Sequence, residues 1–137
     1  MNINTTYTKI ITGEDLMETA QHGSTLYPFQ FYYEDLSVFD FNCIEWHWHT
    51  ELEFIYIESG TVTLWIGEDQ FHLTEGNGVF INTKVLHRLY SPSKALIPNF
   101  VFMPSFIAPC DSLNYQKYNL PINSSTLPFI VYHKKVT

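Results

Sequence analysis

The sequence predicts an all-β domain built as an antiparallel sandwich or barrel. Between Phe29 and Phe102, short runs rich in Phe, Tyr, Ile, Val, Thr and Trp are separated by turn residues, and this composition is typical of β-strands. The turns recur about every 8–12 residues, which favours many short strands in a sandwich or a barrel. The chain has 137 residues, enough for one domain with a substantial hydrophobic core.

The expected strands follow one another closely along the chain. The breaks at Ser59-Gly60 and at Gly67 are short enough for hairpin turns. The apolar segment 127–133, near the end of the chain, is also strand-like. The strand ranges that precede it are 29–33, 43–49, 52–58, 61–66, 70–73, 78–82, 86–90 and 97–103.

Two short helices are expected to flank the strands. Residues 13–22 lie between Thr12, which can cap a helix N-terminus, and Gly23, which can end the helix. Residues 111–119 form the second expected helix, with Pro121 as its stop. The strand-like segment that follows ends abruptly with the chain, which favours a piece cut from a longer protein.

Composition and charge exclude several classes of protein. Charged residues make up only 15% of the chain and aromatic residues 17%, which excludes a disordered tail and a coiled coil. The net charge is −7, and thirteen of the fourteen acids lie in residues 1–76. We therefore expect no direct binding to nucleic acid, which needs clustered Lys and Arg.

The start MNINTTYTK lacks the parts of a signal peptide, and no apolar run approaches the roughly 18 residues of a membrane span. We therefore expect a cytoplasmic protein with no membrane partner.

Two cysteines, Cys43 and Cys110, lie far apart in the sequence and form no Cys-x-x-Cys motif. In a reducing cytoplasm we expect both to be buried free thiols. Neither lies in a motif that suggests a catalytic nucleophile.

One group of residues stands out as a candidate site. On a strand, His47 and His49 point to the same face, and Glu53 opens the next expected strand. His87 is expected to arrive from a strand across the barrel. Three imidazoles and one carboxylate suit a divalent transition metal such as Zn, Ni, Fe or Mn. The alternative is a hydrogen-bonded polar cluster, or the lining of a pocket for a polar ligand without metal.

Other polar residues receive weaker assignments. Leu89 follows His87 by two positions and so shares its face, and Asn99 leads into an apolar strand, so both are predicted to line a ligand pocket. His22 is interpreted as a helix-end residue, while His72 and Glu51 are expected to face solvent. We identify no catalytic residue.

The site residues lie in a pattern that resembles the cupin motifs. His47-x-His49-x3-Glu53-x6-Gly60 looks like the first motif, and Gly76-x5-Asn82-x-Lys84-x2-His87 resembles the second. The sequence departs from these motifs where Phe41 stands for a usual Gly, where Asn82 and Lys84 replace a usual Pro and Gly, and where Ser91 replaces a usual Asn. The four positions that hold metal in cupin enzymes are all filled. The resemblance implies a cupin-like antiparallel β-barrel, a double-stranded jelly roll with short flanking helices, that holds one divalent metal.

A longer set of segments resembles the sensor domain of AraC-type transcription regulators, from about residue 14 to the end. The segments are 22–36, 47–91, 99–107 and 112–122. In that family a small molecule, often a sugar, binds in an N-terminal barrel, further helices dimerise, and a C-terminal pair of helix-turn-helix units reads DNA. The resemblance implies a non-enzymatic effector-sensing domain, a homodimer, and DNA contact only through a C-terminal domain that this chain does not contain.

This resemblance also suggests a division of the chain. Residues 1–28 form an N-terminal arm with a short helix, 29–108 the barrel core, and 109–137 a C-terminal helix and strand that pack on the barrel. The alternative function is a stand-alone metal-dependent cupin enzyme, a dioxygenase or an isomerase, that uses the same four ligands.

Overall fold

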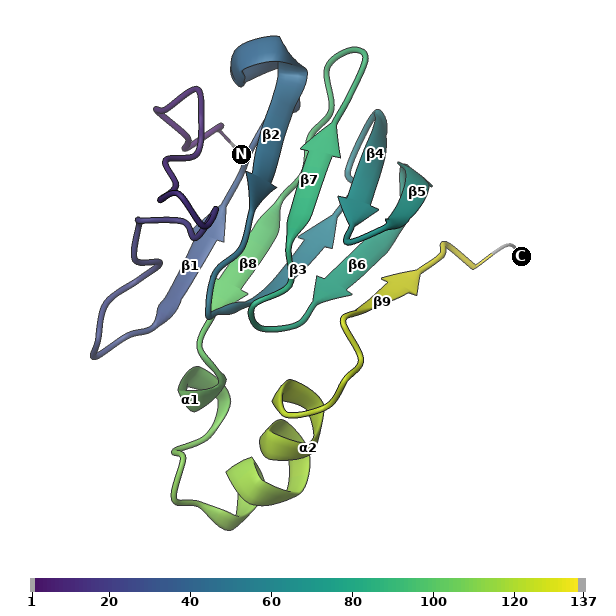
Figure 1. The fold of residues 1–137 in the computed structure, drawn as a ribbon. Coiled ribbons are helices and arrows are strands. Elements are labelled where there is room, and N and C mark those ends of the chain that lie inside the picture. Colours follow the sequence, from purple (N-terminus) through teal and green to yellow (C-terminus); the bar gives the residue numbers. More distant parts are fainter. Residues whose placement is uncertain (1, 136–137) are drawn as a thin grey trace.

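The computed structural model describes residues 2–135, and its nine strands form two facing antiparallel sheets (Figure 1). One sheet has the order β1-β8-β3-β6-β9 and the other the order β2-β7-β4-β5. The predicted all-β class and the predicted strands are confirmed. The strands are β1 Phe29–Tyr32, β2 Cys43–His47, β3 Leu52–Tyr56, β4 Thr61–Ile66, β5 Asp69–Thr74, β6 Gly78–Ile81, β7 His87–Tyr90, β8 Asn99–Phe102 and β9 Phe129–Tyr132.

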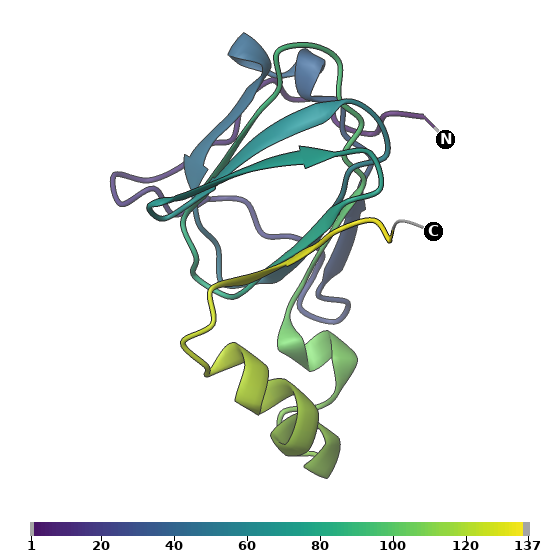
Figure 2. The same ribbon diagram turned by 90° about the vertical axis from the view of Figure 1, so that its right-hand side faces the viewer.

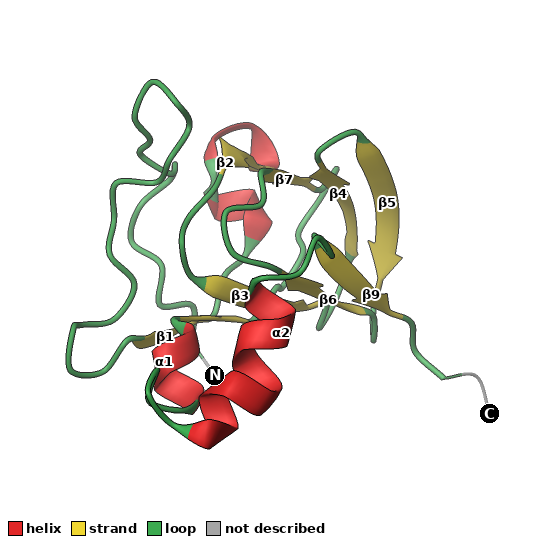
Figure 3. Ribbon diagram, turned by 60° about the horizontal axis from the view of Figure 1, so that its bottom comes forward, coloured by secondary structure: helices red, strands yellow, loops and turns green. Residues whose placement is uncertain are grey.

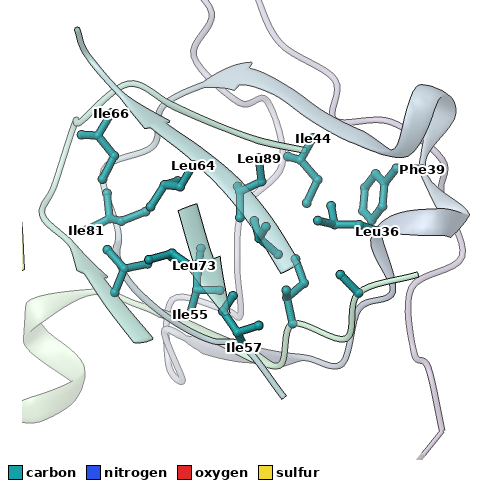
Figure 4. Packing of buried hydrophobic residues seen from close by; sticks show 14 residues of the cluster. Leu36, Phe39, Ile44, Ile55, Ile57, Leu64, Ile66, Leu73, Ile81 and Leu89 are labelled. Atoms are coloured by element: carbon teal, nitrogen blue, oxygen red, sulfur yellow. The ribbon is translucent and has the colours of Figure 1, made fainter. Parts of the chain in front are cut away.

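The hydrophobic core fills the space between the two sheets (Figure 4). Leu64 of β4 and Leu89 of β7 come from one sheet, and Ile55 of β3 and Ile81 of β6 come from the other; all four are buried. Their inward position follows from strand alternation, because successive side chains of a strand point to opposite faces. Burying each such side chain stabilises the fold by about 1.5–3 kcal/mol.

A bulge in β2 sets the direction of the site histidines. Ile44 pairs with Leu89 and His47 pairs with His87, so three steps along β2 match two steps along β7. The extra residue in β2 lets Ile44 and His47 both face the interior, although strict alternation would put them on opposite faces. The bulge therefore joins an apolar stretch of β2 to a polar one on the same side of the sheet.

The two breaks predicted as hairpins differ. The break at Gly67 joins the paired strands β4 and β5, where Ile66 lies opposite Asp69, so this hairpin is confirmed. The prediction of a hairpin at Ser59-Gly60 was wrong, because the strands on either side of this break, β3 and β4, belong to different sheets. At this crossover the backbone of Ser59 bonds Leu96, whose N–H donates to the Ser59 carbonyl at 3.0 Å. A segment distant in the sequence thus takes the place of the hairpin partner.

The helix expected at residues 13–22 is absent; this segment is an extended arm that runs beside β1 and β2 (Figure 1). Its backbone bonds itself in a tight turn, where Gly13 N–H donates to the Met17 carbonyl at 2.9 Å, and it also bonds the chain just after β2. Trp48 N–H donates to the Leu16 carbonyl at 3.1 Å, and Glu18 N–H donates to the Trp48 carbonyl at 2.9 Å. These pairings satisfy the backbone groups that a helix would use, so tertiary hydrogen bonding overrides the local capping signals.

The C-terminal helical region lies beyond one end of the two sheets (Figures 2 and 3). It consists of α1 Pro104–Ile107, a π-helical turn Tyr115–Asn119 and α2 Leu120–Asn123. The helix predicted at 111–119 is confirmed over residues 113–119, but it continues to Asn123. Pro121 therefore lies inside the helix and is not its stop. Proline has no N–H to donate to the carbonyl four residues earlier, and the turn before it is widened, with Leu120 N–H bonded to the Tyr115 carbonyl.

After α2 the chain returns to the barrel as β9, which pairs with β6 (Figure 1). Two short 3-10 helices, Leu36–Val38 and Asp40–Asn42, lie between β1 and β2. Within residues 2–135, every helix falls short of the length and apolar character that a membrane crossing requires.

Both cysteines are free. The predicted burial is confirmed for Cys43, which opens β2, and is wrong for Cys110, which is exposed. Cys110 follows α1, in the part of the chain that lies outside the two sheets, so the core of the barrel does not cover it.

Candidate metal centre

The structure brings His47, His49, Glu53 and His87 together inside the barrel. Their ligand atoms all lie within 4.8 Å of one another, and all four residues are buried. His47 ends β2, and His87 begins the neighbouring strand β7 in the same sheet. The expectation that His87 arrives from across the barrel was therefore wrong: the residue that crosses is Glu53, on β3 of the opposite sheet. The two sheets each contribute ligands to one point.

The three histidine rings are held in the same way. In each, Nδ1 donates to a backbone carbonyl two residues away, at 2.8 Å for His47, 3.1 Å for His49 and 2.8 Å for His87. A carbonyl oxygen can only accept, so Nδ1 carries the proton and Nε2 is left free to bind at the centre of the cluster. Metal-binding histidines are oriented by this kind of outer hydrogen bond. The accepting carbonyls belong to Glu45, Glu51 and Val85.

The Glu53 carboxylate completes the cluster. Its Oε1 lies 2.9 Å from Nε2 of His49 and 3.3 Å from Nε2 of His87. Burial alone would raise the pKa of Glu53, but the two histidines outweigh burial and hold that pKa well below its usual value. The buried Nε2 of His87 has no aligned hydrogen-bond partner within residues 2–135. A buried polar atom without a partner is costly, and a metal at this point would satisfy it.

The histidine rings differ in pKa, and this difference shows which ring offsets the negative charge of Glu53. Burial, together with the neighbouring His87, lowers the pKa of His47 to about 3. Burial also acts to lower the pKa of His49, but the hydrogen bond and charge of Glu53 prevail and raise it to about 9. A proton on His49 thus balances the Glu53 charge, and a divalent cation would take over this role. Three imidazole nitrogens and one carboxylate oxygen fit a divalent transition metal.

A cavity of about 30 Å³, the inner cavity, adjoins the cluster. This is room for about two water molecules. The side chains of Leu89 and Asn99 lie along it, as alternation predicts for Leu89, and both residues are buried. A second cavity of about 190 Å³ is lined mainly by residues of the N-terminal arm. The residues that border both cavities are Tyr7, Ile10, Glu18, His22 and Tyr32.

Two residues of this region lie where sequence reasoning did not place them. His22, interpreted as a helix-end residue, is buried and lies with Nε2 2.6 Å from Glu18 Oε1 and Nδ1 2.6 Å from the Tyr32 hydroxyl. Glu51, expected to face solvent, is buried and accepts a hydrogen bond from the His22 backbone N–H at 3.3 Å. Both are covered because the arm folds back over the barrel instead of forming a helix. The solvent-facing position of His72 is confirmed.

Glu34 was also missed by sequence reasoning. It follows β1, borders the inner cavity, and is buried. Asn99 Nδ2 donates to its carboxylate at 2.6 Å, and the Thr5 hydroxyl donates at 3.4 Å. Burial raises the pKa of Glu34 to about 7, while these two hydrogen bonds act in the opposite direction. No local signal marks this position, because the cover over Glu34 comes from the distant arm and from β8.

Comparison with known proteins bears on this geometry. Residues 43–97 match the family described as Cupin domain. Over 77 residues the chain is 30% identical to YdeC of Bacillus subtilis (strain 168), named as an uncharacterized HTH-type transcriptional regulator. That match covers 56% of this chain and 26% of the relative, so the chain spans about a quarter of the length of the curated relative it matches.

Several solved structures, two of them named as cupins, are similar to this chain. A cupin superfamily protein from Desulfitobacterium hafniense DCB-2 matches with a TM-score of 0.52 and 10% identity, over 59% of this chain and 71% of that one. A conserved protein of unknown function from Streptococcus pyogenes matches with a TM-score of 0.51 and 18% identity, over 56% and 66%. An RmlC-like cupin from Shewanella frigidimarina NCIMB 400 matches with a TM-score of 0.50 and 17% identity, over 56% and 67%. With two facing antiparallel sheets and a Cupin domain match at residues 43–97, this chain has the cupin fold.

Proposed function

We propose that this chain is the effector-sensing domain of an AraC-type transcription regulator and that a divalent metal helps to form its binding pocket. The match to an HTH-type regulator supports the regulatory role. The acidic charge of the chain, −7, suits a domain that leaves DNA contact to another part of the protein. DNA would be bound through a C-terminal helix-turn-helix domain outside this chain, in a cytoplasmic homodimer.

The observation that supports the metal most strongly is the shared orientation of the three histidines. Each ring gives its Nδ1 proton to a backbone carbonyl and leaves Nε2 for the centre. His47, His49 and His87 would bind the metal through Nε2, and Glu53 would bind it through its carboxylate. The metal, Zn, Ni, Fe or Mn, would act as a Lewis acid toward an oxygen atom of the effector.

The effector, a small molecule such as a sugar, would bind in the inner cavity beside the cluster. Leu89 would contact its apolar part, and Asn99 would contribute a polar group. The cavity of about 30 Å³ is smaller than a sugar, so binding would require displacement of the arm residues that border it. An effector that binds one arrangement better than another shifts the population toward that arrangement.

The alternative function is a metal-dependent enzyme, a dioxygenase or an isomerase. The same observation favours it, because four protein ligands around a transition metal leave positions open for a substrate. The two functions differ in the protein to which the domain belongs. Mass spectrometry of the native gene product from its own cells distinguishes them: a product about twice this length with helix-turn-helix peptides supports the regulator, and one of 16.0 kDa supports the enzyme.

The metal is tested by elemental analysis of protein purified without a nickel column. Wild-type protein is expected to contain about one equivalent of a divalent transition metal, and the double variant His47→Ala, His49→Ala is expected to contain none. His72→Ala, which removes an exposed histidine outside the cluster, is the matched control and should keep the metal. Equal metal content in wild type and the double variant would contradict the metal site.

Effector binding is tested by heating the metal-loaded protein with a panel of sugars. A sugar that binds the folded state raises the melting temperature by mass action. The variant Asn99→Leu, altered in the cavity, should lose this shift. A panel without any shift would contradict a sugar effector and leave the metal result standing.

A further inference from the structure

The loop at residues 82–86 joins β6 to His87 and contacts the metal cluster. The backbone N–H of Lys84 donates to the His49 carbonyl at 2.8 Å, and the Thr83 hydroxyl donates to the Thr50 carbonyl at 2.6 Å. The Val85 carbonyl accepts the Nδ1 proton of His87. Two of the four candidate ligands, His49 and His87, are thus hydrogen-bonded directly to this loop.

The same loop begins with Asn82, which holds the C-terminal segment. Its side-chain Nδ2 donates to the carbonyls of Ile122 and Leu127, each at 2.9 Å, and its backbone N–H donates to the Pro128 carbonyl at 2.9 Å. Asn82 is buried, with 3% of its surface exposed. One side chain therefore links the end of α2, the start of β9 and the loop of the metal site.

The sequence of this loop departs from the second cupin motif at the two positions that make these contacts. Asn82 stands where the motif usually has Pro, and a proline could make neither the side-chain nor the backbone hydrogen bonds described here. Lys84 stands where the motif usually has Gly and has a φ of +62°, a left-handed conformation that is strained for a residue other than glycine. The hydrogen bond from Lys84 to His49 helps to hold this strained conformation.

We propose that Asn82 is a coupling residue that transmits occupancy of the metal site to the C-terminal segment 115–132. This inference rests on the proposed metal site and concerns its regulation. A bound metal restricts His49 and His87, and through them it restricts residues 83–85. Asn82 then carries the restriction to the carbonyls of Ile122 and Leu127. The segment so held is the one from which a longer protein would continue.

Hydrogen–deuterium exchange of the 137-residue chain tests the coupling, with Zn²⁺, Ni²⁺ and Mn²⁺ added one at a time. In wild-type protein, a metal that binds should slow exchange in peptides from 115–132 by at least about fivefold. In Asn82→Ala this protection should disappear, while protection of the peptides that contain His49 and His87 remains. Because coupling is reciprocal, Asn82→Ala should also weaken metal affinity by a similar factor.

Asn119→Ala is the matched control. Asn119 Nδ2 donates to the Pro104 carbonyl at 3.0 Å and so braces the helical region without touching the loop. This variant should keep the metal-dependent protection and the wild-type metal affinity. If Asn82→Ala does not fold, Asn82→Ser, whose side chain is too short to reach both carbonyls, replaces it.

The outcomes separate the coupling from the metal site on which it rests. Wild-type protein that binds metal in a titration but shows unchanged exchange at 115–132 overturns the coupling alone, and this measurement needs no variant. Metal-dependent protection that survives in Asn82→Ala shows that another path carries it and overturns the role of Asn82. A chain that binds none of the three metals overturns both proposals.

Discussion

Glu34 illustrates what a single buried carboxylate contributes to this protein. It accepts hydrogen bonds from Asn99 and Thr5 and lies beside the cavity of the candidate metal cluster. Burial is the main reason that its pKa is raised from 4.5 to about 7. Since the folded protein holds this proton more tightly than the unfolded chain, the contribution of Glu34 to folding is largest at acidic pH, where Glu34 is protonated in both states.

Replacing Glu34 by Gln should therefore remove the part of the loss of stability between pH 4.5 and about 7 that Glu34 causes. In wild-type protein the Glu34 contribution is fully present below pH 4.5 and is lost as the pH rises through about 7, a change of up to about 3 kcal/mol in the free energy of unfolding. Glu34→Gln keeps an oxygen for Asn99 and removes the titration. Urea unfolding at several pH values between 4.5 and 8 measures the difference.

Glu45→Gln is the control for this experiment. Glu45 is an exposed carboxylate paired with Arg88, and the hydrogen bond from Arg88 lowers its pKa. Its removal should leave the Glu34-dependent loss of stability between pH 4.5 and 7 in place. A Glu34→Gln profile that parallels the wild-type profile would show that Glu34 titrates normally in the folded protein.

The candidate metal ligands could be predicted at the residue scale, but their surroundings could not. Alternation along one strand places His47 and His49 on one face, and motif spacing adds Glu53 and His87; the structure brings these four together. The polar residues of the arm that border the cavity carry no such pattern. Their position depends on how the arm crosses the barrel, which is decided by backbone bonds such as those of Trp48.

At the scale of elements, two glycine turns show how local sequence and tertiary contact differ. Gly60 and Gly67 both have positive φ, +87° and +58°. Gly67 lies in the β4–β5 hairpin, where an added Cβ would meet nothing within 4 Å. At Gly60, in the crossover between the sheets, an added Cβ would lie 2.6 Å from the Lys94 carbonyl oxygen and 2.9 Å from Ala95 Cα.

Alanine substitutions at the two glycines should separate backbone strain from close packing. Gly67→Ala should cost about 1–2 kcal/mol, the penalty of a left-handed conformation. Gly60→Ala should cost a further 1–3 kcal/mol or so, because backbone atoms must move to admit the methyl group. Urea unfolding with an unchanged m-value measures both losses. Equal losses at the two positions would contradict the close approach of Lys94 and Ala95.

The strands were predictable because side-chain alternation and turn residues are local signals. The prediction of a helix at 13–22 failed because capping residues indicate only a local preference. In the folded protein, the backbone of this segment is hydrogen-bonded to the chain that follows β2. The bulge in β2 left no recognisable signal either, yet it decides that Ile44 and His47 both face inward. An element is thus predictable where its own residues carry the signal, even when, as for β1 and β8, its pairing partner is distant.

On the scale of the whole molecule, the candidate metal site joins the two sheets. His47 and His87 belong to the four-stranded sheet, and Glu53 belongs to the five-stranded sheet. The same two sheets enclose the apolar core. A metal bound to all three residues would add a link across the barrel that the unfolded chain cannot form.

Metal should therefore stabilise the folded chain. At a free Zn²⁺ concentration about one hundred times Kd, the free energy of unfolding should rise by about 2.7 kcal/mol. Thermal unfolding of metal-stripped protein, with Zn²⁺ added stepwise, measures the rise as an increase in Tm. His72→Ala should show the same increase and His87→Ala should show none. An increase in Tm of His87→Ala as large as that of wild type would place the metal elsewhere.

The sequence by itself determined the all-β class, the strand positions and the residues that make up the candidate metal site. The class and the strand positions depend on composition, turn residues and period-2 alternation, which are properties of neighbouring residues, and the site residues depend also on the motif spacing that adds Glu53 and His87. Only the tertiary structure decided which strands share a sheet, that His87 lies beside His47, and that the arm buries His22. It also decided that Asn82 bonds the C-terminal segment. The physical reason is that each of these features is a hydrogen bond or a packing contact between distant segments, whose partner no local pattern specifies.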